Sequence, residues 1–271
     1  MEENFYRPFW AKITKIKDET ENIRLFSLKL EKWIDFKPGQ FCLVGIPGFG
    51  EAPFDICSPT NDGDDVEIVV RHAGLLTKKM FEFKVGDSFT FRGPYGNGFP
   101  PLKAFENRNL LMVGGGTAII VIRGLIQEMI ANNFSAKTKP QVFYGAKNWK
   151  SLMFRDEFKI WKKYFDLHFI LEDVKGAELT CSVGLITGLF DSVKVAPNPK
   201  IIMCGPPVMY KFCMEKISKL GTDLKDIYLS LERRMHCGKG VCQHCAVGEK
   251  YICKDGTVFT YDELKHIPDA L

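Results

Sequence analysis

The chain has 271 residues, of which 45% are hydrophobic and 26% charged, and its formal net charge is +4. This length allows one large or two ordinary domains, and the composition is that of a globular protein. A net charge this small gives no support for a nucleic-acid-binding or membrane-surface protein.

The beginning of the chain carries no sign of export. Residues 1–4 lack the basic start and apolar segment of a secretory signal. The longest mostly apolar run, residues 110–122, contains three consecutive glycines and is too short to span a membrane. We therefore expect a cytoplasmic protein without a transmembrane segment.

From residue 9 to about residue 92 the sequence consists of short strands rich in Ile, Val and Phe, separated by turns such as those at residues 37–40, 59–63 and 86–87. This spacing predicts a small antiparallel β-barrel, with its clearest strand at residues 66–70. A short helix is expected to begin at Leu75 and to carry Met80 and Phe81, with Thr77 as its cap. We assign residues 1–104 to this domain.

After a stretch dense in glycine and proline at residues 93–99, apolar strands alternate with helical patterns. Strand–helix alternation of this kind predicts an α/β domain, a parallel sheet with helices on both faces, at residues 105–228. The predicted strands are residues 109–113, 141–144, 165–171, 201–203 and 227–231. The predicted helices are residues 119–132, 154–161, 185–193 and 207–220.

The last part of the chain contains four cysteines with the spacing C-x4-C-x2-C-x7-C: Cys237, Cys242, Cys245 and Cys253. A 2Fe–2S cluster needs four thiolates in one small volume and backbone N–H groups turned toward the sulfurs, and glycines in the first interval allow such a tight loop. The first three cysteines have the spacing of plant-type ferredoxins. We expect residues 229–271 to form a cluster-binding module that ends in a helical turn at residues 261–264.

Three other interpretations of these cysteines remain open. A structural zinc site also uses four cysteines, but it usually has two C-x2-C pairs, and only one is present. Disulfides would need an oxidising compartment, of which the sequence gives no sign. His236 and His244 are neighbours that a Rieske centre could use, although four cysteines leave them more suited to surface or supporting positions.

The first strand of the second domain runs directly into Gly114, Gly115, Gly116 and Thr117. At this edge of a parallel sheet, glycines let the backbone approach a pyrophosphate and a helix N-terminus offers free N–H groups. The G-x-G-x-x-G spacing is not met, so a tight turn without ligand is the alternative. A second turn at the same edge consists of Cys204, Gly205, Pro206 and Pro207, with Pro207 suited to begin a helix.

Two stretches of the barrel are candidates for a second, larger cofactor. In residues 53–58, Phe54 is suited to lie against a flat ring. In residues 71–77, Gly74 and the helix start at Thr77 are suited to hold phosphates. A core aromatic residue and a helix-capping threonine explain the same residues without a ligand.

With these motifs in this order, the chain resembles the ferredoxin–NADP reductase superfamily, from residues 38–41 through to the cysteine loop. It is most similar to the electron-transfer subunits of two cytosolic assemblies, the gamma subunit of NAD(P)-linked nickel-iron hydrogenase (sulfhydrogenase) and its counterpart in anaerobic sulfite reductase. The electron-transfer subunit of dihydroorotate dehydrogenase is a more distant relative. The short interval before Cys253 favours the hydrogenase and sulfite reductase branch.

The resemblance implies an NAD(P)H-dependent oxidoreductase subunit that carries FAD, a 2Fe–2S cluster and NAD(P), and that works with the catalytic and iron–sulfur subunits of a larger redox complex. It places Cys204 as the candidate catalytic residue. The implied FAD-binding residues are Pro53, Phe54, Asp55, Ile56, Arg71, Gly74, Leu76 and Thr77. The implied NAD(P)-binding residues are Gly114, Gly115, Gly116, Thr117, Gly205, Pro206 and Pro207.

Two departures from the family pattern affect these expectations. Asp55 stands where a serine is usual, and an ionised aspartate accepts a hydrogen bond but does not donate one. The glycine turn continues through Ala118 and Ile120, which are larger than the usual residues and crowd the nucleotide. An electron-transfer protein that no longer uses nicotinamide is therefore the alternative function.

Overall fold

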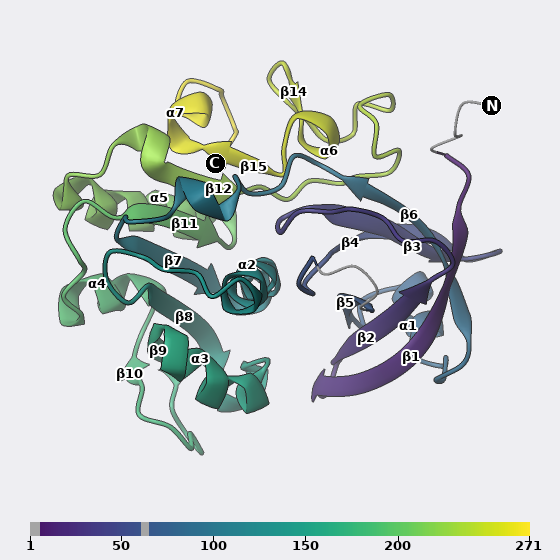
Figure 1. Cartoon of the computed structure of the whole chain (residues 1–271), viewed down its shortest axis with the longest axis horizontal. Coiled ribbons are helices and arrows are strands. Elements are labelled where there is room, and N and C mark those ends of the chain that lie inside the picture. Colours follow the sequence, from purple (N-terminus) through teal and green to yellow (C-terminus); the bar gives the residue numbers. More distant parts are fainter. Residues whose placement is uncertain (1–5, 61–64) are drawn as a thin grey trace. The chain divides into compact units, whose positions relative to one another are not determined.

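A computed structural model describes residues 6–60 and 65–271 of the chain. The start of the chain and most of the turn predicted at residues 59–63 lie outside these residues. The chain forms two compact units (Figure 1). The first contains the chain up to Phe99 together with residues 123–128 and 232–257, and the second contains residues 100–122, 129–231 and 258–271. No helix in the described part of the chain is long and apolar enough to cross a membrane.

The first unit is built on a six-stranded antiparallel sheet with the order β4-β3-β6-β1-β2-β5. Its elements are β1 (Phe9–Thr20), β2 (Ile23–Leu30), β3 (Phe41–Ile46), β4 (Gly50–Asp55), β5 (Val66–Arg71), α1 (Leu75–Met80) and β6 (Ser88–Tyr95). An isolated bridge between Ile56 and Ile68 joins the two outer strands and closes the sheet into the predicted barrel.

The barrel interior follows from the two-residue period of its strands, in which successive side chains point to opposite faces. In β1, Ala11 and Ile13 are fully buried, while Lys12 between them is exposed. Phe26 and Phe89 meet in the core with ring centroids 5.5 Å apart. Aromatic and β-branched residues thus fill the barrel.

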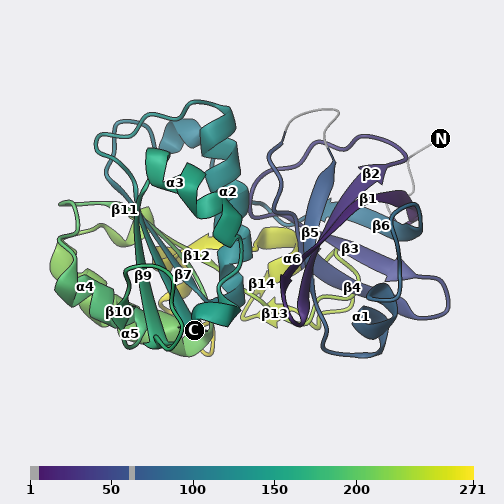
Figure 2. The same cartoon turned by 90° about the horizontal axis from the view of Figure 1, so that it is seen from below.

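The second unit is built on a seven-stranded sheet with the order β10-β9-β8-β7-β11-β12-β15. Its strands are β7 (Leu110–Gly115), β8 (Gln141–Asn148), β9 (Asp166–Asp173), β10 (Ser182–Val183), β11 (Lys200–Cys204), β12 (Ile227–Ser230) and β15 (Val258–Thr260). Its main helices are α2 (Ile119–Ala131), α3 (Phe158–Tyr164), α4 (Leu189–Ser192), α5 (Pro207–Ile217) and α7 (Tyr261–Leu264). Figure 2 shows α3 on one side of the sheet and α4 and α5 on the other. The predicted fold class is confirmed.

Two predicted helices are shorter than expected. The helix predicted from residue 154 begins as a 3-10 turn at Arg155–Glu157 and becomes α-helical only at Phe158. Phe154 has a positive φ of 58° and is fully buried, so the chain cannot be helical there. The helix predicted at residues 185–193 is a 3-10 turn, Ile186–Gly188, followed by the single turn of α4.

Two short strands of the second sheet, β10 and β15, were not predicted. β15 pairs antiparallel with β12 at the edge of a sheet whose other pairings are parallel. Its three residues, Val258–Thr260, follow the cysteines directly, and three residues are too few to show a two-residue period. The chain beyond the cysteine loop thus returns to the second unit.

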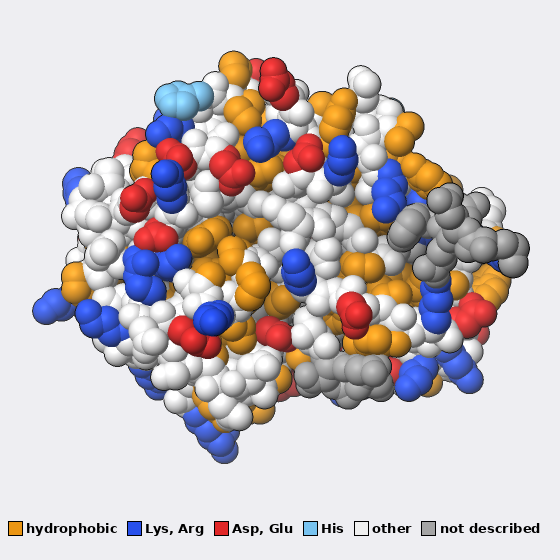
Figure 3. Space-filling model, turned by 45° about the horizontal axis from the view of Figure 1, so that its top comes forward, with side chains coloured by type: hydrophobic (Ala, Val, Ile, Leu, Met, Phe, Trp, Pro, Cys, Tyr) orange, Lys and Arg blue, Asp and Glu red, His pale blue; other side chains and the backbone are white. Residues whose placement is uncertain are grey.

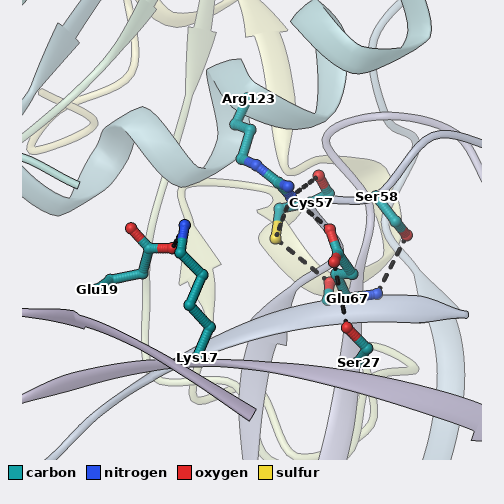
Figure 4. A network of polar contacts seen from close by, with 7 residues as sticks. All are labelled: Lys17, Glu19, Ser27, Cys57, Ser58, Glu67 and Arg123. Carbon is teal, nitrogen blue, oxygen red and sulfur yellow. Dashed lines mark hydrogen bonds and ion pairs between the residues drawn. The ribbon is translucent and has the colours of Figure 1, made fainter. Parts of the chain in front are cut away.

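A buried polar network fastens the middle of α2 to the barrel within the first unit (Figure 4). Arg123 is 5% exposed, and its Nη1 lies 2.7 Å from Oε2 of Glu67 and donates to the Cys57 carbonyl at 2.8 Å. Ser27 donates to the other oxygen of Glu67 at 3.2 Å. The network therefore holds the backbone that directly follows β4, Ile56 and Cys57, in a fixed position.

Figure 3 shows one face of the surface, where lysine and arginine side chains are interspersed with acidic and hydrophobic ones. A nucleic-acid-binding face needs basic side chains gathered in a patch or stripe. This face has no such patch, in keeping with the net charge of +4.

Candidate functional site

The cysteine loop, residues 232–257, belongs to the first unit. Its backbone turns sharply and brings N–H groups close to the cysteine sulfurs. Gly238 and Gly240 have φ values of +74° and +70°, a region that favours glycine. They turn the chain between Cys237 and Cys242. The loop also contains two short strands, β13 (Ala246–Val247) and β14 (Lys250–Tyr251), and the one-turn helix α6 (Ile252–Asp255), which carries Cys253.

Backbone N–H groups in this loop point at cysteine sulfurs. The sulfur of Cys237 accepts hydrogen bonds from the N–H groups of Lys239 and Val241, both at 3.4 Å, and of Cys242 at 3.5 Å. The sulfur of Cys253 accepts one from Gly240 at 3.2 Å. Hydrogen bonds of this kind stabilise thiolates and cluster sulfurs, and they were the feature expected of a cluster loop.

The cysteines differ in their affinity for protons. Burial raises the pKa of Cys237, but the backbone hydrogen bonds outweigh burial, and the pKa lies below the usual thiol value. Hydrogen bonding from the His244 backbone also lowers the pKa of Cys242. Burial raises the pKa of Cys253 to about 12. Ligation to iron would therefore displace a proton from Cys253.

The four sulfurs form two pairs. Cys237 and Cys242 interact through their side chains, and the sulfurs of Cys245 and Cys253 are 3.3 Å apart. Across the described residues, no three histidine, cysteine or acidic side chains converge closely enough to hold a single metal ion. Two such pairs match the way in which four cysteine thiolates are shared between the two irons of a 2Fe–2S cluster.

The structure also shows where the two histidines of the loop lie and whether its cysteines form disulfides. His236 and His244 are exposed and stack edge to face on each other, with ring centroids 4.7 Å apart. They are surface groups, which agrees with their expected role outside the ligand set. In the described part of the chain, which includes all nine cysteines, no disulfide bond is formed.

The proposed flavin residues of β4 lie at the edge of the barrel sheet. Pro53, Phe54 and Asp55 are half-buried. Ile56 is fully buried in the barrel core, and its N–H donates to the Gln40 carbonyl at 3.1 Å. Burial raises the pKa of Asp55 from 3.8 to about 7, and the Glu232 carboxylate adds to the rise. The structure thus makes Asp55 a carboxyl group that changes charge near neutral pH.

The proposed phosphate-binding residues lie at the start of α1. Arg71 and Gly74 are exposed, and Leu76 and Thr77 are half-buried. Thr77 is not the cap residue of the helix, because the helix begins one residue after Gly74. Its hydroxyl instead accepts hydrogen bonds from the N–H groups of Ala73 and Gly74, both at 2.9 Å. Thr77 therefore folds the preceding loop back onto the helix.

The two proposed nucleotide turns meet at one edge of the second sheet. β7 and β11 are parallel neighbours, and their register places Gly114 opposite Cys204. Gly116 has a φ of +59°, and a Cβ there would meet nothing within 4 Å. α5 begins at Pro207 as predicted, with Pro206 as its N-cap residue. Cys204, the candidate catalytic residue, is only 1% exposed, so its thiol is buried.

The other glycines of this edge face protein rather than open space. A Cβ on Gly114 would lie 3.0 Å from Ile122 and 3.1 Å from Ile119. A Cβ on either Gly115 or Gly205 would lie 2.6 Å from the sulfur of Met209. Met209, on α5, thus fills the space between the two turns. The glycines permit close packing here, a role that sequence spacing does not distinguish from ligand binding.

Sequence reasoning missed several residues that hold the cysteine loop, among them Arg92 and Tyr95. Arg92 donates to the His236 carbonyl at 3.5 Å, and the ring of Tyr95 lies against Gly238. The only sequence signal was the glycine- and proline-rich stretch at residues 93–99, which resembles a linker as much as a support.

Three family models match successive parts of the chain. The oxidoreductase FAD-binding domain matches residues 10–99, and the oxidoreductase NAD-binding domain matches residues 112–215. The iron–sulfur cluster binding domain of dihydroorotate dehydrogenase B matches residues 232–265. The expected cofactor classes, FAD, a nicotinamide nucleotide and an iron–sulfur cluster, are confirmed at this level.

Similar proteins match nearly the whole chain. Sulfhydrogenase 2 subunit gamma of Pyrococcus furiosus is 36% identical over 95% of this chain and 96% of its own length. A probable dihydroorotate dehydrogenase B (NAD(+)) electron transfer subunit of Thermoplasma acidophilum is 31% identical over 95% of this chain and 91% of its own. A solved structure of an NADH-dependent reduced ferredoxin-NADP oxidoreductase has a TM-score of 0.75 at 24% identity, covering 93% of this chain and 88% of that chain, and supports the fold.

Proposed function

This chain belongs to the ferredoxin–NADP reductase-like family of electron-transfer subunits, and from that premise we propose that it is the diaphorase subunit of a larger redox complex. It is an oxidoreductase with FAD-binding, NAD-binding and iron–sulfur domains. In the proposed function it moves electrons between NAD(P)(H), FAD and a 2Fe–2S cluster. The electrons then pass to or from a partner catalytic subunit such as a hydrogenase or a sulfite reductase.

One observation carries this proposal: the cluster loop follows the two cofactor domains in the same chain, as in a relative that aligns over 96% of its length. FAD, when bound, takes two electrons at once as a hydride and passes them on singly, as an iron–sulfur cluster requires. One chain with all three domains has the parts for this conversion.

In the proposal the chain's own residues bind and orient the three groups. The four loop cysteines hold the cluster, with the backbone N–H groups of Lys239, Gly240 and Val241 already turned toward sulfur. The half-buried surface of β4 positions the flavin ring. The loop that ends at Gly74, together with Thr77 of α1, holds the flavin phosphates. Gly116, whose surroundings are open, offers its backbone to the nucleotide. Asp55, beside the flavin, holds or releases a proton near neutral pH.

A specific observation favours a second candidate, the electron-transfer subunit of a dihydroorotate dehydrogenase. The cluster-binding model that matches residues 232–265 is that of dihydroorotate dehydrogenase B. The interval of seven residues before Cys253 supports the hydrogenase-type partner instead. In the proposal, the chain meets a partner of either kind in the cytoplasm.

The test is anaerobic mixing of the purified native complex with NADH and, separately, with NADPH. We expect one nucleotide to bleach the bound flavin and then the cluster absorbance. If flavin and cluster are present but neither nucleotide bleaches them, the protein is an electron carrier that does not use nicotinamide. Iron and acid-labile sulfide analysis tests the cluster, and identification of the copurifying subunit distinguishes the two partner classes.

A further inference from the structure

The end of β6 touches the last cysteine of the cluster loop. The N–H of Gly96 donates to the carbonyl of Cys253 at 3.1 Å. Next to it, the N–H of Asn97 donates to the Gly256 carbonyl, and its side-chain amide donates to the Asp255 carbonyl at 3.2 Å. Three consecutive hydrogen bonds therefore tie α6 and its Cys253 to the end of one barrel strand.

The same strand touches the first cysteine of the loop through the ring of Tyr95. Tyr95 is 4% exposed, and a Cβ on Gly238 would lie 2.8 to 2.9 Å from three atoms of its ring. Only glycine fits at this distance, and its φ of +74° also favours glycine. Gly238 directly follows Cys237, so the Tyr95 ring forms the floor under that ligand. The ammonium group of Lys239 lies 5.7 Å from the centroid of the same ring.

An ion pair between buried Arg92 and exposed Glu51 fixes Tyr95 and the loop to each other. Arg92 is 7% exposed, and its Nε lies 2.9 Å from Oε2 of Glu51, with a second contact between its Nη2 and the other carboxylate oxygen. Its Nη1 donates to the Tyr95 hydroxyl at 3.2 Å, and its Nη2 to the His236 carbonyl at 3.5 Å. Bidentate pairs of this kind have a defined geometry, so one guanidinium orients both the ring and the loop.

Tyr95 is also two strands away from the proposed flavin residue Asp55. Phe41 in β3 is paired with Asp55 in β4 on one side and with Tyr95 in β6 on the other. Since neighbouring strands are about 4.8 Å apart, the backbones of Asp55 and Tyr95 are about 10 Å apart. The rings of Phe41 and Tyr95 have centroids 5.6 Å apart. Tyr95 is thus packed against Phe41, the strand neighbour of the proposed flavin residue Asp55.

We propose that Tyr95, oriented by the Arg92–Glu51 pair, is a positioning residue that sets the distance and path between the flavin and the cluster and so the rate of electron transfer between them. The step it supports moves one electron: the reduced flavin loses it, the oxidised cluster gains it, and no bond forms or breaks at Tyr95. This inference rests on the proposed function, because it takes the four loop cysteines as cluster ligands and β4 as the flavin strand.

The test uses the intact complex with three variants. Tyr95→Leu removes the flat floor and the hydroxyl, Gly238→Ala forces the loop off the ring, and Tyr95→Phe keeps the ring without the hydroxyl. Phe91→Leu is the matched control, because Phe91 is a fully buried aromatic residue on the same strand whose side chain belongs to the barrel core. Rapid mixing with the reducing nucleotide measures flavin bleaching and cluster reduction separately, and the EPR spectrum reports the cluster environment.

Displacement of reacting groups by about 1 Å can slow a reaction by orders of magnitude, so we expect Tyr95→Leu and Gly238→Ala to slow cluster reduction by about tenfold or more. Both should alter the EPR spectrum and leave the rate of flavin bleaching nearly unchanged. Tyr95→Phe should restore most of the rate. Unaltered cluster reduction in Tyr95→Leu and Gly238→Ala, or an equal loss in Phe91→Leu, overturns the proposal. If the native protein contains no cluster, the proposed function itself has failed.

Discussion

The cysteine loop and the glycine edge of the second sheet are both short glycine-containing turns, but the structure uses their glycines differently. In the loop, Gly238 and Gly240 let the backbone curl until its N–H groups reach the sulfurs of Cys237 and Cys253. At the sheet edge, Gly115 and Gly205 make room for the side chain of Met209.

A glycine turn can be organised for a ligand before the ligand arrives, or be filled by the protein itself. The loop presents its hydrogen-bond donors without any movement of side chains. At the sheet edge, the side chain of Met209 occupies the space beside Gly115 and Gly205, whereas a Cβ on Gly116 would meet nothing within 4 Å. Preorganisation lowers the cost of binding, so the two sites should respond differently to substitution.

The largest effect is expected from Cys245→Ala, which breaks the preorganised site. Because a cluster needs four thiolates, iron and acid-labile sulfide should fall to background, while nucleotides still bleach the flavin. Cys213→Ala is the control, since Cys213 is an equally buried cysteine on α5. Retention of a full complement of iron by Cys245→Ala would exclude Cys245 as a ligand.

A smaller effect is expected from Met209→Ala, which removes the side chain that fills the space beside Gly115 and Gly205. Nucleotide affinity, measured by fluorescence titration, should rise roughly fivefold, because ordering or displacing one flexible side chain costs about 1 kcal/mol. The free energy of unfolding should fall by about 2 kcal/mol, as for other buried methionines. Met112→Ala removes a buried methionine from β7 and should lower stability without raising affinity. Equal nucleotide affinity in both variants would contradict the account of Met209.

The smallest effect concerns Asp55, a charged residue in the half-buried surface of β4. Its folded pKa of about 7 exceeds its ordinary value of 3.8, so the folded state binds the proton more tightly than the unfolded chain. The contribution of Asp55 to the free energy of unfolding is therefore fully present below pH 4 and is lost as the pH rises through 7. Glu232 and Cys42 are the titratable groups that interact with it.

Asp55→Asn should remove that dependence. We expect the difference in the free energy of unfolding between the variant and the native chain to change by about 1 kcal/mol in favour of the variant from pH 5 to pH 8. This value, to be measured by urea unfolding of the flavin-free protein, allows for the partial exposure of the side chain. Glu106→Gln, at an exposed position, serves as the control. Parallel stability curves for Asp55→Asn and the native chain would show that the carboxyl titrates normally.

Local patterns were sufficient wherever the relevant contacts lie close in sequence. The alternation of Ala11, Lys12 and Ile13 identified a barrel strand, and the spacing of four cysteines identified the loop that turns N–H groups toward sulfur. The prediction failed at Phe154, where the tightly packed interior holds a left-handed residue within an otherwise helical pattern. It also failed at β15, which exists only because β12 is available beside it.

Neighbouring residues were enough to predict the barrel, the parallel sheet and the four candidate ligands, because strand and helix periods and ligand spacing are local features. Three features arise only from tertiary packing: Met209 fills the nucleotide edge, burial raises the pKa of Asp55, and Arg92 and Tyr95 support the cluster loop. Arg92 and His236 are 144 residues apart in the chain, and such contacts arise only when the whole fold has formed.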